Sequence, residues 1–115
     1  MPQKILFVDE DSSIGEDFKS AFSKEIAMKQ YSIILCQSGE EALKIIEKNE
    51  ALDLLITDLY FQDALLGGWE FIKTLREKNI MVKTIILSSY VSYESRIKAL
   101  KENVVTILEK PVLFS

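Results

Sequence analysis

Five short apolar runs, each about the length of a β-strand, alternate along this chain with longer amphipathic stretches. The runs are continuous and rich in Ile, Leu and Val, which is typical of strands buried on both faces of a sheet. They occupy residues 4–8, 32–36, 53–57, 84–87 and 104–108. Strands that alternate with helices pair in parallel, so the pattern predicts an α/β domain with one parallel sheet.

The first two amphipathic stretches each have a helical pattern and a start signal. Apolar residues recur at every fourth position of the first stretch, at Ile14, Phe18, Phe22 and Ile26. We expect one helix there, with Ser13 and Glu16 forming a capping box at its start. Ser38 and Glu41 repeat the same signature before a second helix. That helix should bury Ala42, Leu43, Ile45 and Ile46.

Two further helices are expected in the second half of the chain. One should follow Gly68 and bury the apolar side chains of Phe71, Ile72 and Leu75. The other should run over residues 92–102, with Ile97 and Leu100 pointing inward. Asn103 suits a left-handed cap at the end of this helix, because asparagine tolerates positive φ better than most residues.

The length of 115 residues corresponds to one compact domain, residues 1–115. In the flavodoxin-like form of the doubly wound fold, the strand order would be 2-1-3-4-5. A helix should also follow the fifth strand, yet the sequence stops at Ser115, shortly after that strand. We therefore expect a domain truncated before its last helix, cut from a longer protein that continues beyond Ser115.

Composition excludes several classes of function. The net charge is −4 and the basic residues are scattered, which argues against direct binding of nucleic acid by this domain. The absence of histidine removes Ser-His-Asp and Cys-His catalysis and His-ligated zinc. No segment has the length of a membrane span. Cys36 is the only cysteine, so no internal disulfide can form and we expect a cytoplasmic protein.

Candidate functional side chains follow four of the five predicted strands. They are Asp9, Glu10 and Asp11 after the first strand, Asp58 after the third, Ser88 and Ser89 after the fourth, and Lys110 after the fifth. Ligands of such sheets bind outside the carboxyl ends of the strands, where the strand order reverses. With the first and third strands adjacent, Asp58 should face Asp9 and Glu10 across one crevice. Ser88 and Lys110 should flank that crevice.

This set of residues predicts a metal-assisted phosphoryl transfer. Taken singly, acidic residues after a strand are most often a solvated turn or a helix cap, which is how we interpret Asp11. Carboxylates crowded into one pocket repel one another and are the ligands that Mg²⁺ prefers. An aspartate in such a pocket can accept a phosphoryl group as an acyl phosphate, while a metal ion and a lysine neutralise the charge.

Four segments carry a resemblance to a known family. They are "LFVDED" at the first strand, "GEEALKIIEKNEALDLLITDL" from the second helix to the third strand, "TIILSS" at the fourth strand and "EKP" after the fifth. Together they resemble the receiver domains of response regulators, the CheY-like family of two-component signalling. The separations of Asp58, Ser88 and Lys110 also match this family, and the resemblance covers nearly the whole chain.

The resemblance implies a role for each candidate residue. Asp58 would be the phosphoacceptor, Ser88 the switch hydroxyl that reaches the phosphoryl oxygen, and Lys110 the ion-pair partner of the phosphoryl group. Mg²⁺ would bind to Asp9, Glu10, Asp58 and the backbone carbonyl of Tyr60. The donor would be a partner histidine kinase or histidine phosphotransfer protein, because this chain has no histidine. Phosphorylation would switch the conformation to control an output domain or a partner, with a phosphorylation-dependent dimer as one outcome.

Some positions depart from the family pattern. The loop after the phosphoacceptor has Gln62 where the family usually has a proline, and Ile107 replaces the switch aromatic residue of the fifth strand. The Lys110–Pro111 bond is expected to be cis, as in many members. We expect no enzyme activity beyond assistance of the domain's own phosphorylation and dephosphorylation. The dephosphorylation should be slow, because Tyr60 and Tyr90 lack a carboxylate or amide to orient water.

Three alternatives remain open. A pseudo-receiver would keep the fold as a protein-interaction module without phosphorylation; the altered loop favours it, and the presence of Asp58 and Lys110 argues against it. A phosphatase-type enzyme would need a general acid two residues after Asp58, where Tyr60 is a poor one. Flavin binding on the same fold is disfavoured by the lack of a phosphate-cradling loop.

Overall fold

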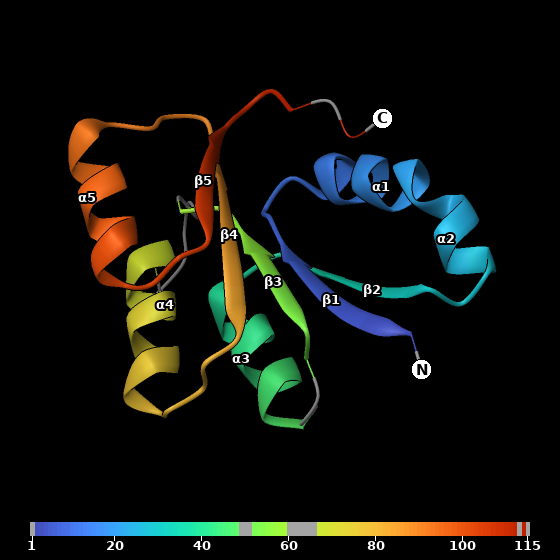
Figure 1. Ribbon diagram of the computed structural model, residues 1–115, viewed down its shortest axis with the longest axis horizontal. Coiled ribbons are helices and arrows are strands. Elements are labelled where there is room, and N and C mark those ends of the chain that lie inside the picture. Colours follow the sequence, from blue (N-terminus) through green and yellow to red (C-terminus); the bar gives the residue numbers. More distant parts are fainter. Residues whose placement is uncertain (1, 49–51, 60–66, 113, 115) are drawn as a thin grey trace.

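The computed structural model describes residues 2–48, 52–59, 67–112 and 114. Within them, one sheet of five parallel strands runs through the middle of the molecule (Figure 1). The strands are β1 (Gln3–Val8), β2 (Tyr31–Cys36), β3 (Leu54–Thr57), β4 (Lys83–Ser88) and β5 (Thr106–Glu109). Their order in the sheet is β2-β1-β3-β4-β5, which confirms the predicted flavodoxin-like α/β fold.

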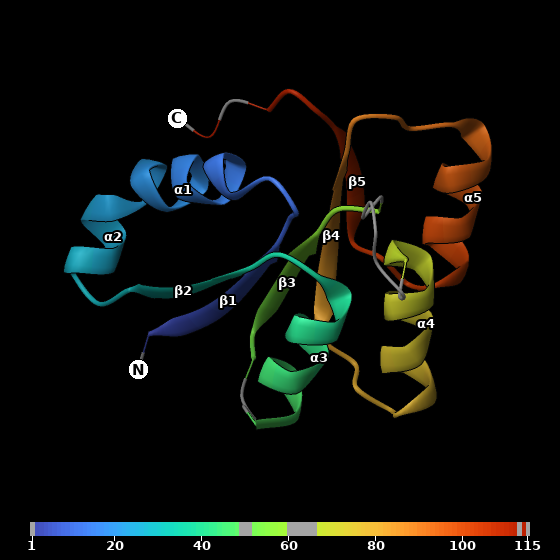
Figure 2. The ribbon, with the colours of Figure 1, turned by 180° about the vertical axis from the view of Figure 1, so that it is seen from behind.

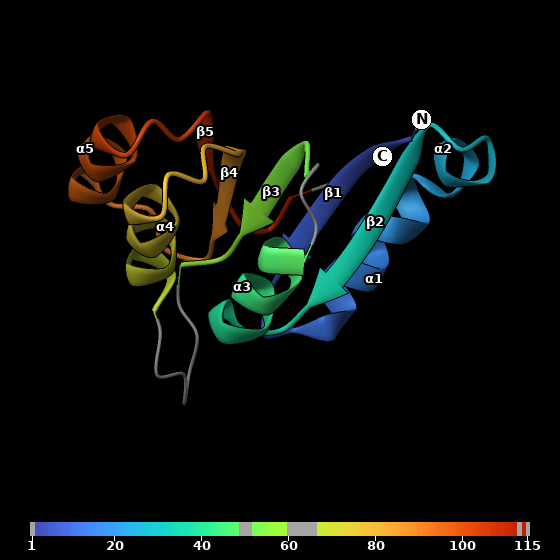
Figure 3. The ribbon, with the colours of Figure 1, turned by 90° about the horizontal axis from the view of Figure 1, so that it is seen from below.

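Helices of the described chain cover both faces of this sheet. They are α1 (Ser12–Ala21), α2 (Ser23–Ala27), α3 (Gly39–Lys48), α4 (Gly68–Glu77) and α5 (Tyr93–Lys101). Figures 2 and 3 show α1 and α2 on one face and α3, α4 and α5 on the other. None of these helices is long and apolar enough to cross a membrane.

The chain leaves β5 through a Lys110–Pro111 bond that is cis, as expected. The described residues after this bond, 111–112 and 114, form no helix. Phe114 instead packs edge-on against Phe7 and Phe18, with ring centroids 6.4 and 5.3 Å away. The end of the described chain therefore lies on the same face of the sheet as α1.

Side chains of successive strand residues alternate between the two faces, and each face has its own core. Phe7 and Leu87 pack on the face covered by α1. Leu6 packs under α3 and α4, and Ile86 packs under α4 and α5. At the carboxyl end of each strand, the same alternation determines on which face of the sheet the next polar side chain lies.

The first helix differs from the prediction in its start and its length. Asp11 is the N-cap: its carboxylate accepts the N–H of Ser13 at 3.0 Å and the Ser13 hydroxyl at 2.6 Å. The predicted capping box of Ser13 and Glu16 is therefore wrong, because an aspartate two residues earlier already satisfies an amide of the first turn. The single predicted helix is interrupted at Phe22, which separates α1 from α2. The predicted apolar stripe still packs on the sheet.

Other helix ends follow the sequence patterns. Ser38 Oγ accepts the N–H of Glu41 at 3.1 Å, and the Glu41 carboxylate accepts the N–H of Gln37 at 3.2 Å. Ser92 caps α5, and Asn103 after α5 has the predicted positive φ, at 56°. The apolar residues expected inside α3 all pack into the core: Ala42, Leu43, Ile45 and Ile46.

The inward face of α5 was predicted wrongly. Ile97 and Leu100 do not point inward, since they are 37% and 77% exposed. The buried side chains of this helix are Ser95 and Ala99. Ala99 packs in one cluster with Ile86 and Ile107 of the sheet and with Ile72 of α4.

Gly68 fixes the start of α4 next to the end of β3. Its N–H donates to the carbonyl of Leu59 at 3.0 Å, and a Cβ at this position would lie 2.6 Å from that carbonyl oxygen. Glycine is required here because backbone approaches backbone. The helix then buries three apolar side chains completely, as predicted: Phe71, Ile72 and Leu75.

Gly68→Ala should lower the free energy of unfolding by about 2 to 3 kcal/mol, because the new methyl group overlaps backbone atoms of Leu59. Gly67→Ala is the matched control, since its Cβ would meet only the carboxylate of Glu70, the far end of a flexible side chain. Urea unfolding of both variants measures the difference. Equal midpoints would show that the close approach at Gly68 does not position α4.

Candidate functional site

Three of the candidate residues meet at the carboxyl end of the sheet. The Lys110 ammonium lies 2.6 Å from Oδ2 of Asp9 and 2.9 Å from Oδ2 of Asp58. Both aspartates are nearly buried, at 4% and 8% exposure. One cation from the end of β5 therefore bridges two acids from the ends of β1 and β3.

The hydrogen-bond ladder of the sheet places these three residues. Each stands one position beyond the end of its own strand and is held by the neighbouring strand. The N–H of Asp9 donates to the last carbonyl of β2 at 3.0 Å, and that of Asp58 to the last carbonyl of β1 at 3.0 Å. The N–H of Lys110 donates to the last carbonyl of β4 at 2.8 Å. The backbone that carries these three side chains is thus held by the hydrogen bonds of the sheet.

For Asp9 and for Lys110, burial and the bonds to charged partners shift the pKa in opposite directions. Removal from water raises the pKa of Asp9, and the hydrogen bonds from Lys110 and from the N–H of Asp11 offset only part of that rise. Burial also disfavours the charged form of Lys110, but its bonds to Asp9 and Asp58 outweigh this effect and raise the pKa of the ammonium. Lys110 is therefore charged at neutral pH, and its charge makes two buried carboxylates tolerable.

An open cavity of about 380 Å³ lies in front of these groups. Its lining residues are Asp9, Glu10, Asp11, Ile14, Asp58, Ser89 and Lys110. The Asp11 N–H donates to Oδ1 of Asp9 at 2.9 Å, so the acidic loop folds back on the first aspartate. The carboxylate of Asp11 accepts hydrogen bonds from Ser13, which confirms its role as a helix cap, and these bonds lower its pKa. We refer to this space as the acidic cavity.

Carboxylate oxygens are suitable ligands for a divalent cation, and one of those at the acidic cavity has no hydrogen-bond partner within the residues that the structure describes. Oε2 of Glu10 is buried and has no hydrogen-bond partner in the described part of the chain. A buried carboxylate oxygen of this kind is what a hard cation satisfies. Among the described residues, no three acidic, histidine or cysteine side chains are grouped closely enough to hold a metal by themselves. Tyr60, the predicted carbonyl ligand, lies outside the described residues, as does Gln62.

The two serines after the core of β4 have different surroundings. Ser88 is fully buried; its Oγ donates to the carbonyl of Tyr90 at 3.0 Å and accepts the N–H of Tyr90 at 3.3 Å. The predicted switch hydroxyl is thus bonded to the loop that follows it. Ser89, which was not among the predicted site residues, lines the acidic cavity. The alternation of side chains along a strand is the sequence signal that separates these two neighbours.

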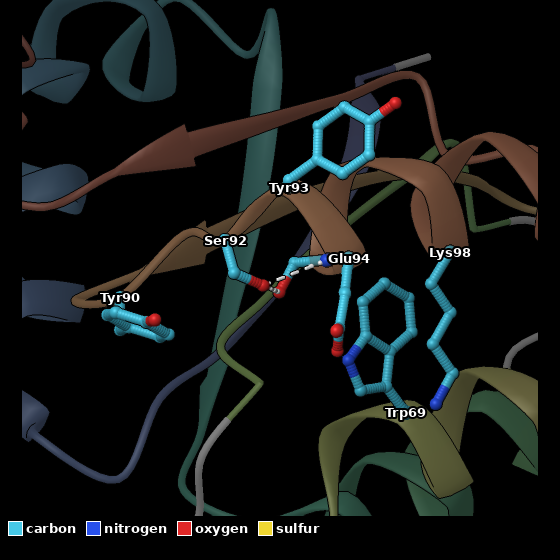
Figure 4. A pocket seen from close by; sticks show the side chains of 7 residues that line it. Trp69, Tyr90, Ser92, Tyr93, Glu94 and Lys98 are labelled. Atoms are coloured by element: carbon cyan, nitrogen blue, oxygen red, sulfur yellow. Dashed lines mark hydrogen bonds between the residues drawn. The ribbon is translucent and has the colours of Figure 1, made fainter.

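The loop after Ser88 leads to a second cavity, between α4 and α5 (Figure 4). This cavity has a volume of about 550 Å³ and is lined by Trp69, Tyr90, Ser92, Tyr93, Glu94, Ser95 and Lys98. The Lys98 ammonium lies 5.1 Å from the centre of the Trp69 ring, a cation–π contact. Tyr90 links the two regions, because Ser88 holds its backbone while its side chain lines the α4–α5 cavity.

Lys110→Met should lower the free energy of unfolding at neutral pH by about 3 kcal/mol, because two buried carboxylates lose their shared cation. The pKa of Asp9, which burial already raises in the folded protein, would then rise further because its hydrogen bond from Lys110 is lost. The folded state would bind more protons than the unfolded chain, so the stability of this variant should increase as the pH falls below neutral.

Lys78→Met is the control, since it removes an exposed ion pair with Glu47 at 3.4 Å and should change stability by less than about 0.5 kcal/mol. Urea unfolding at neutral and mildly acid pH measures both variants. A Lys110→Met protein that loses further stability in mild acid would contradict the bridging role of this ammonium.

Several solved receiver domains have a fold similar to that of this chain. The signal receiver domain of a putative LuxO repressor protein from Vibrio parahaemolyticus has a TM-score of 0.87 at 22% sequence identity, covering 99% of this chain and 82% of that chain. The receiver domain of the Francisella response regulator 1452 has a TM-score of 0.83 at 30% identity, covering 97% and 87%. The first likeness shows the fold alone.

Curated sequences give the same family. Response regulator MprA of Mycobacterium sp. (strain KMS) is 29% identical over 111 residues, which are 96% of this chain and 45% of that protein. Transcriptional regulatory protein CitT of Halalkalibacterium halodurans is 31% identical over 104 residues, covering 86% and 44%. The chain spans less than half the length of these relatives. The profile of the response regulator receiver domain matches residues 5–115, and the chain therefore belongs to this CheY-like family of two-component signalling.

Proposed function

We propose that Asp58 is the phosphoacceptor of this receiver domain. The observation that carries the proposal is the pairing of Asp58 with Lys110 on the wall of an open acidic cavity. The donor is a phosphohistidine on a histidine kinase or a histidine phosphotransfer protein, or a small acyl phosphate, because the chain has no histidine of its own. The domain assists its own modification and has no other substrate.

The surroundings of Asp58 suit a nucleophile that must hold its position. Its N–H is bonded to the end of β1, and its Oδ1 accepts the N–H of Leu59 at 2.7 Å. One carboxylate oxygen attacks phosphorus, the bond from phosphorus to the donor nitrogen breaks, and the imidazole leaves with the electron pair. The ammonium of Lys110 balances the negative charge that the phosphoryl oxygens bring into the cavity.

The acidic side of the same cavity is the proposed Mg²⁺ site. Asp9, Glu10 and Asp58 would hold the ion, together with the backbone carbonyl of Tyr60. When bound, the ion neutralises charge on the phosphoryl oxygens. Because Asp9 is already paired with Lys110, the ammonium must share or give up this carboxylate while it keeps Asp58.

Ser88 is the proposed switch hydroxyl. To reach a phosphoryl group on Asp58, its Oγ must give up both hydrogen bonds to the backbone of Tyr90. The ring of Tyr90 lines the α4–α5 cavity, so its release would alter that surface (Figure 4). The change would then be detectable at the surface between α4 and α5. Ile107 stands where the family has its switch aromatic residue, and the aromatic residue whose backbone is bonded to Ser88 is Tyr90.

The downstream role follows from the relatives. Several are called response regulators or transcriptional regulatory proteins, and this chain matches less than half of each. We assign the receiver the control of an output domain or partner protein in the cytoplasm, without direct contact to nucleic acid. Dimerisation on phosphorylation is one form that this control can take.

One observation favours a second candidate function. In the described part of the chain, the acids do not form a ready metal site, and Lys110 occupies the position between Asp9 and Asp58. A receiver in which this bridge never opens would act as a protein-interaction module without phosphorylation. Phosphorylation of the protein decides between the two functions.

The wild-type protein should gain one phosphoryl group when incubated with acetyl phosphate and Mg²⁺, and Asp58→Asn should gain none. Intact-mass spectrometry measures the addition. Asp53→Asn is the matched control, because Asp53 precedes the opposite end of the same strand and is distant from the cavity. A labelled Asp58→Asn protein, or a folded wild type without label, would refute the phosphoacceptor role.

Glu10→Gln should weaken Mg²⁺ binding by roughly tenfold, because the buried oxygen that lacks a partner loses its charge. Glu16→Gln, an exposed position of α1, should leave the affinity unchanged. Isothermal titration calorimetry with MgCl₂ compares the two variants with the wild type. Equal affinities in all three proteins would remove Glu10 from the metal site.

A further inference from the structure

Ser89 presents an exposed hydroxyl beside the groups on which the proposed phosphorylation depends. It lines the acidic cavity together with Asp58 and Lys110. It also lines an adjoining cavity of about 390 Å³, next to Lys110 and Pro111. Ser88, by contrast, is fully buried and bonded to the following loop. Of these two serines, Ser89 is the one that a molecule entering the acidic cavity meets.

The geometry of the sheet explains why the side chains of Ser88 and Ser89 are directed to opposite faces. Leu87 belongs to the core on the α1 face and Ile86 to the core under α5. Continued alternation directs Ser89 to the side of Leu87, and Ser88 to the side of Ile86.

The same geometry places Ser89 beside Lys110. Ser88 pairs with Glu109 in the parallel register, and the Lys110 N–H donates to the Ser88 carbonyl at 2.8 Å. Ser89 and Lys110 are therefore the next residues along two adjacent strands. The Lys110 ammonium in turn lies 2.9 Å from Asp58. Hydroxyl, ammonium and carboxylate thus surround one part of the acidic cavity.

We infer that the Ser89 hydroxyl donates a hydrogen bond to the phosphoryl group of an incoming donor and promotes its transfer to Asp58. This inference rests on the proposed function. A carboxylate oxygen of Asp58 forms the new bond to phosphorus, the bond from phosphorus to the donor breaks, and the donor leaves with the electron pair. Ser89 keeps its proton and stabilises charge on a non-bridging oxygen of the phosphoryl group as that group is transferred. Ser88 stays bonded to Tyr90 during this step and acts only afterwards.

The test compares initial rates of phosphorylation by acetyl phosphate and Mg²⁺, followed by intact mass. Ser89→Ala should react roughly tenfold more slowly, the size of effect expected for one hydrogen bond to a charged group. Ser89→Thr keeps the hydroxyl and should keep most of the rate. Ser20→Ala, at an exposed serine of α1, is the matched control and should react like the wild type.

A second readout separates contact with the phosphoryl group from an effect on the fold. Binding of trifluoroberyllate, a mimic of the aspartyl phosphate, can be followed through the fluorescence of Trp69, the only tryptophan. Ser89→Ala should bind the mimic more weakly by roughly the same factor. Wild-type rate and affinity in Ser89→Ala would overturn this inference alone. A wild type that takes no label would overturn the proposed function, and this inference with it.

Discussion

One ammonium group between two buried carboxylates is the interaction on which the functional end of this sheet depends. Asp9 and Asp58 end adjacent strands, so without Lys110 their charges would repel where β1 and β3 terminate. The backbone of Lys110 is in turn bonded to the end of β4. Three strand ends therefore share one charge balance, and the end of β4 is bonded to the backbone of its cation. A metal ion or a phosphoryl group that enters the cavity alters this balance for all of them at once.

Most of the architecture could be predicted because it follows from burial. Continuous apolar runs identify strands covered on both faces, and the order of elements then leaves few topologies. The same reasoning brought Asp9, Asp58 and Lys110 to one end of the sheet. Their proximity needed no knowledge of side-chain conformation, since each stands directly after a strand and is fixed by the ladder.

The predictions that were wrong or incomplete concern local features that tertiary contacts determine. Two acceptors compete for the start of α1, and Asp11 satisfies the first-turn amide before Ser13 can act as the cap. In α5 the amphipathic pattern places large residues inward, yet close packing selects Ser95 and Ala99. The hydroxyl of Ser88 bonds to the next loop, a contact that depends on the path of the chain after the strand. Hydrophobic periodicity contains no information about any of these.

The small inward residues of α5 also determine how firmly this helix is held. Hydrophobic stabilisation scales with the apolar area removed from water, and Ser95 and Ala99 bury little of it compared with Phe71 and Leu75 of α4. We therefore expect α5 to detach at a lower free energy than is needed to unfold the whole domain. A thermodynamically soft helix thus directly follows the loop that Ser88 holds, so local rearrangement there can proceed while the cores on both faces of the sheet stay intact.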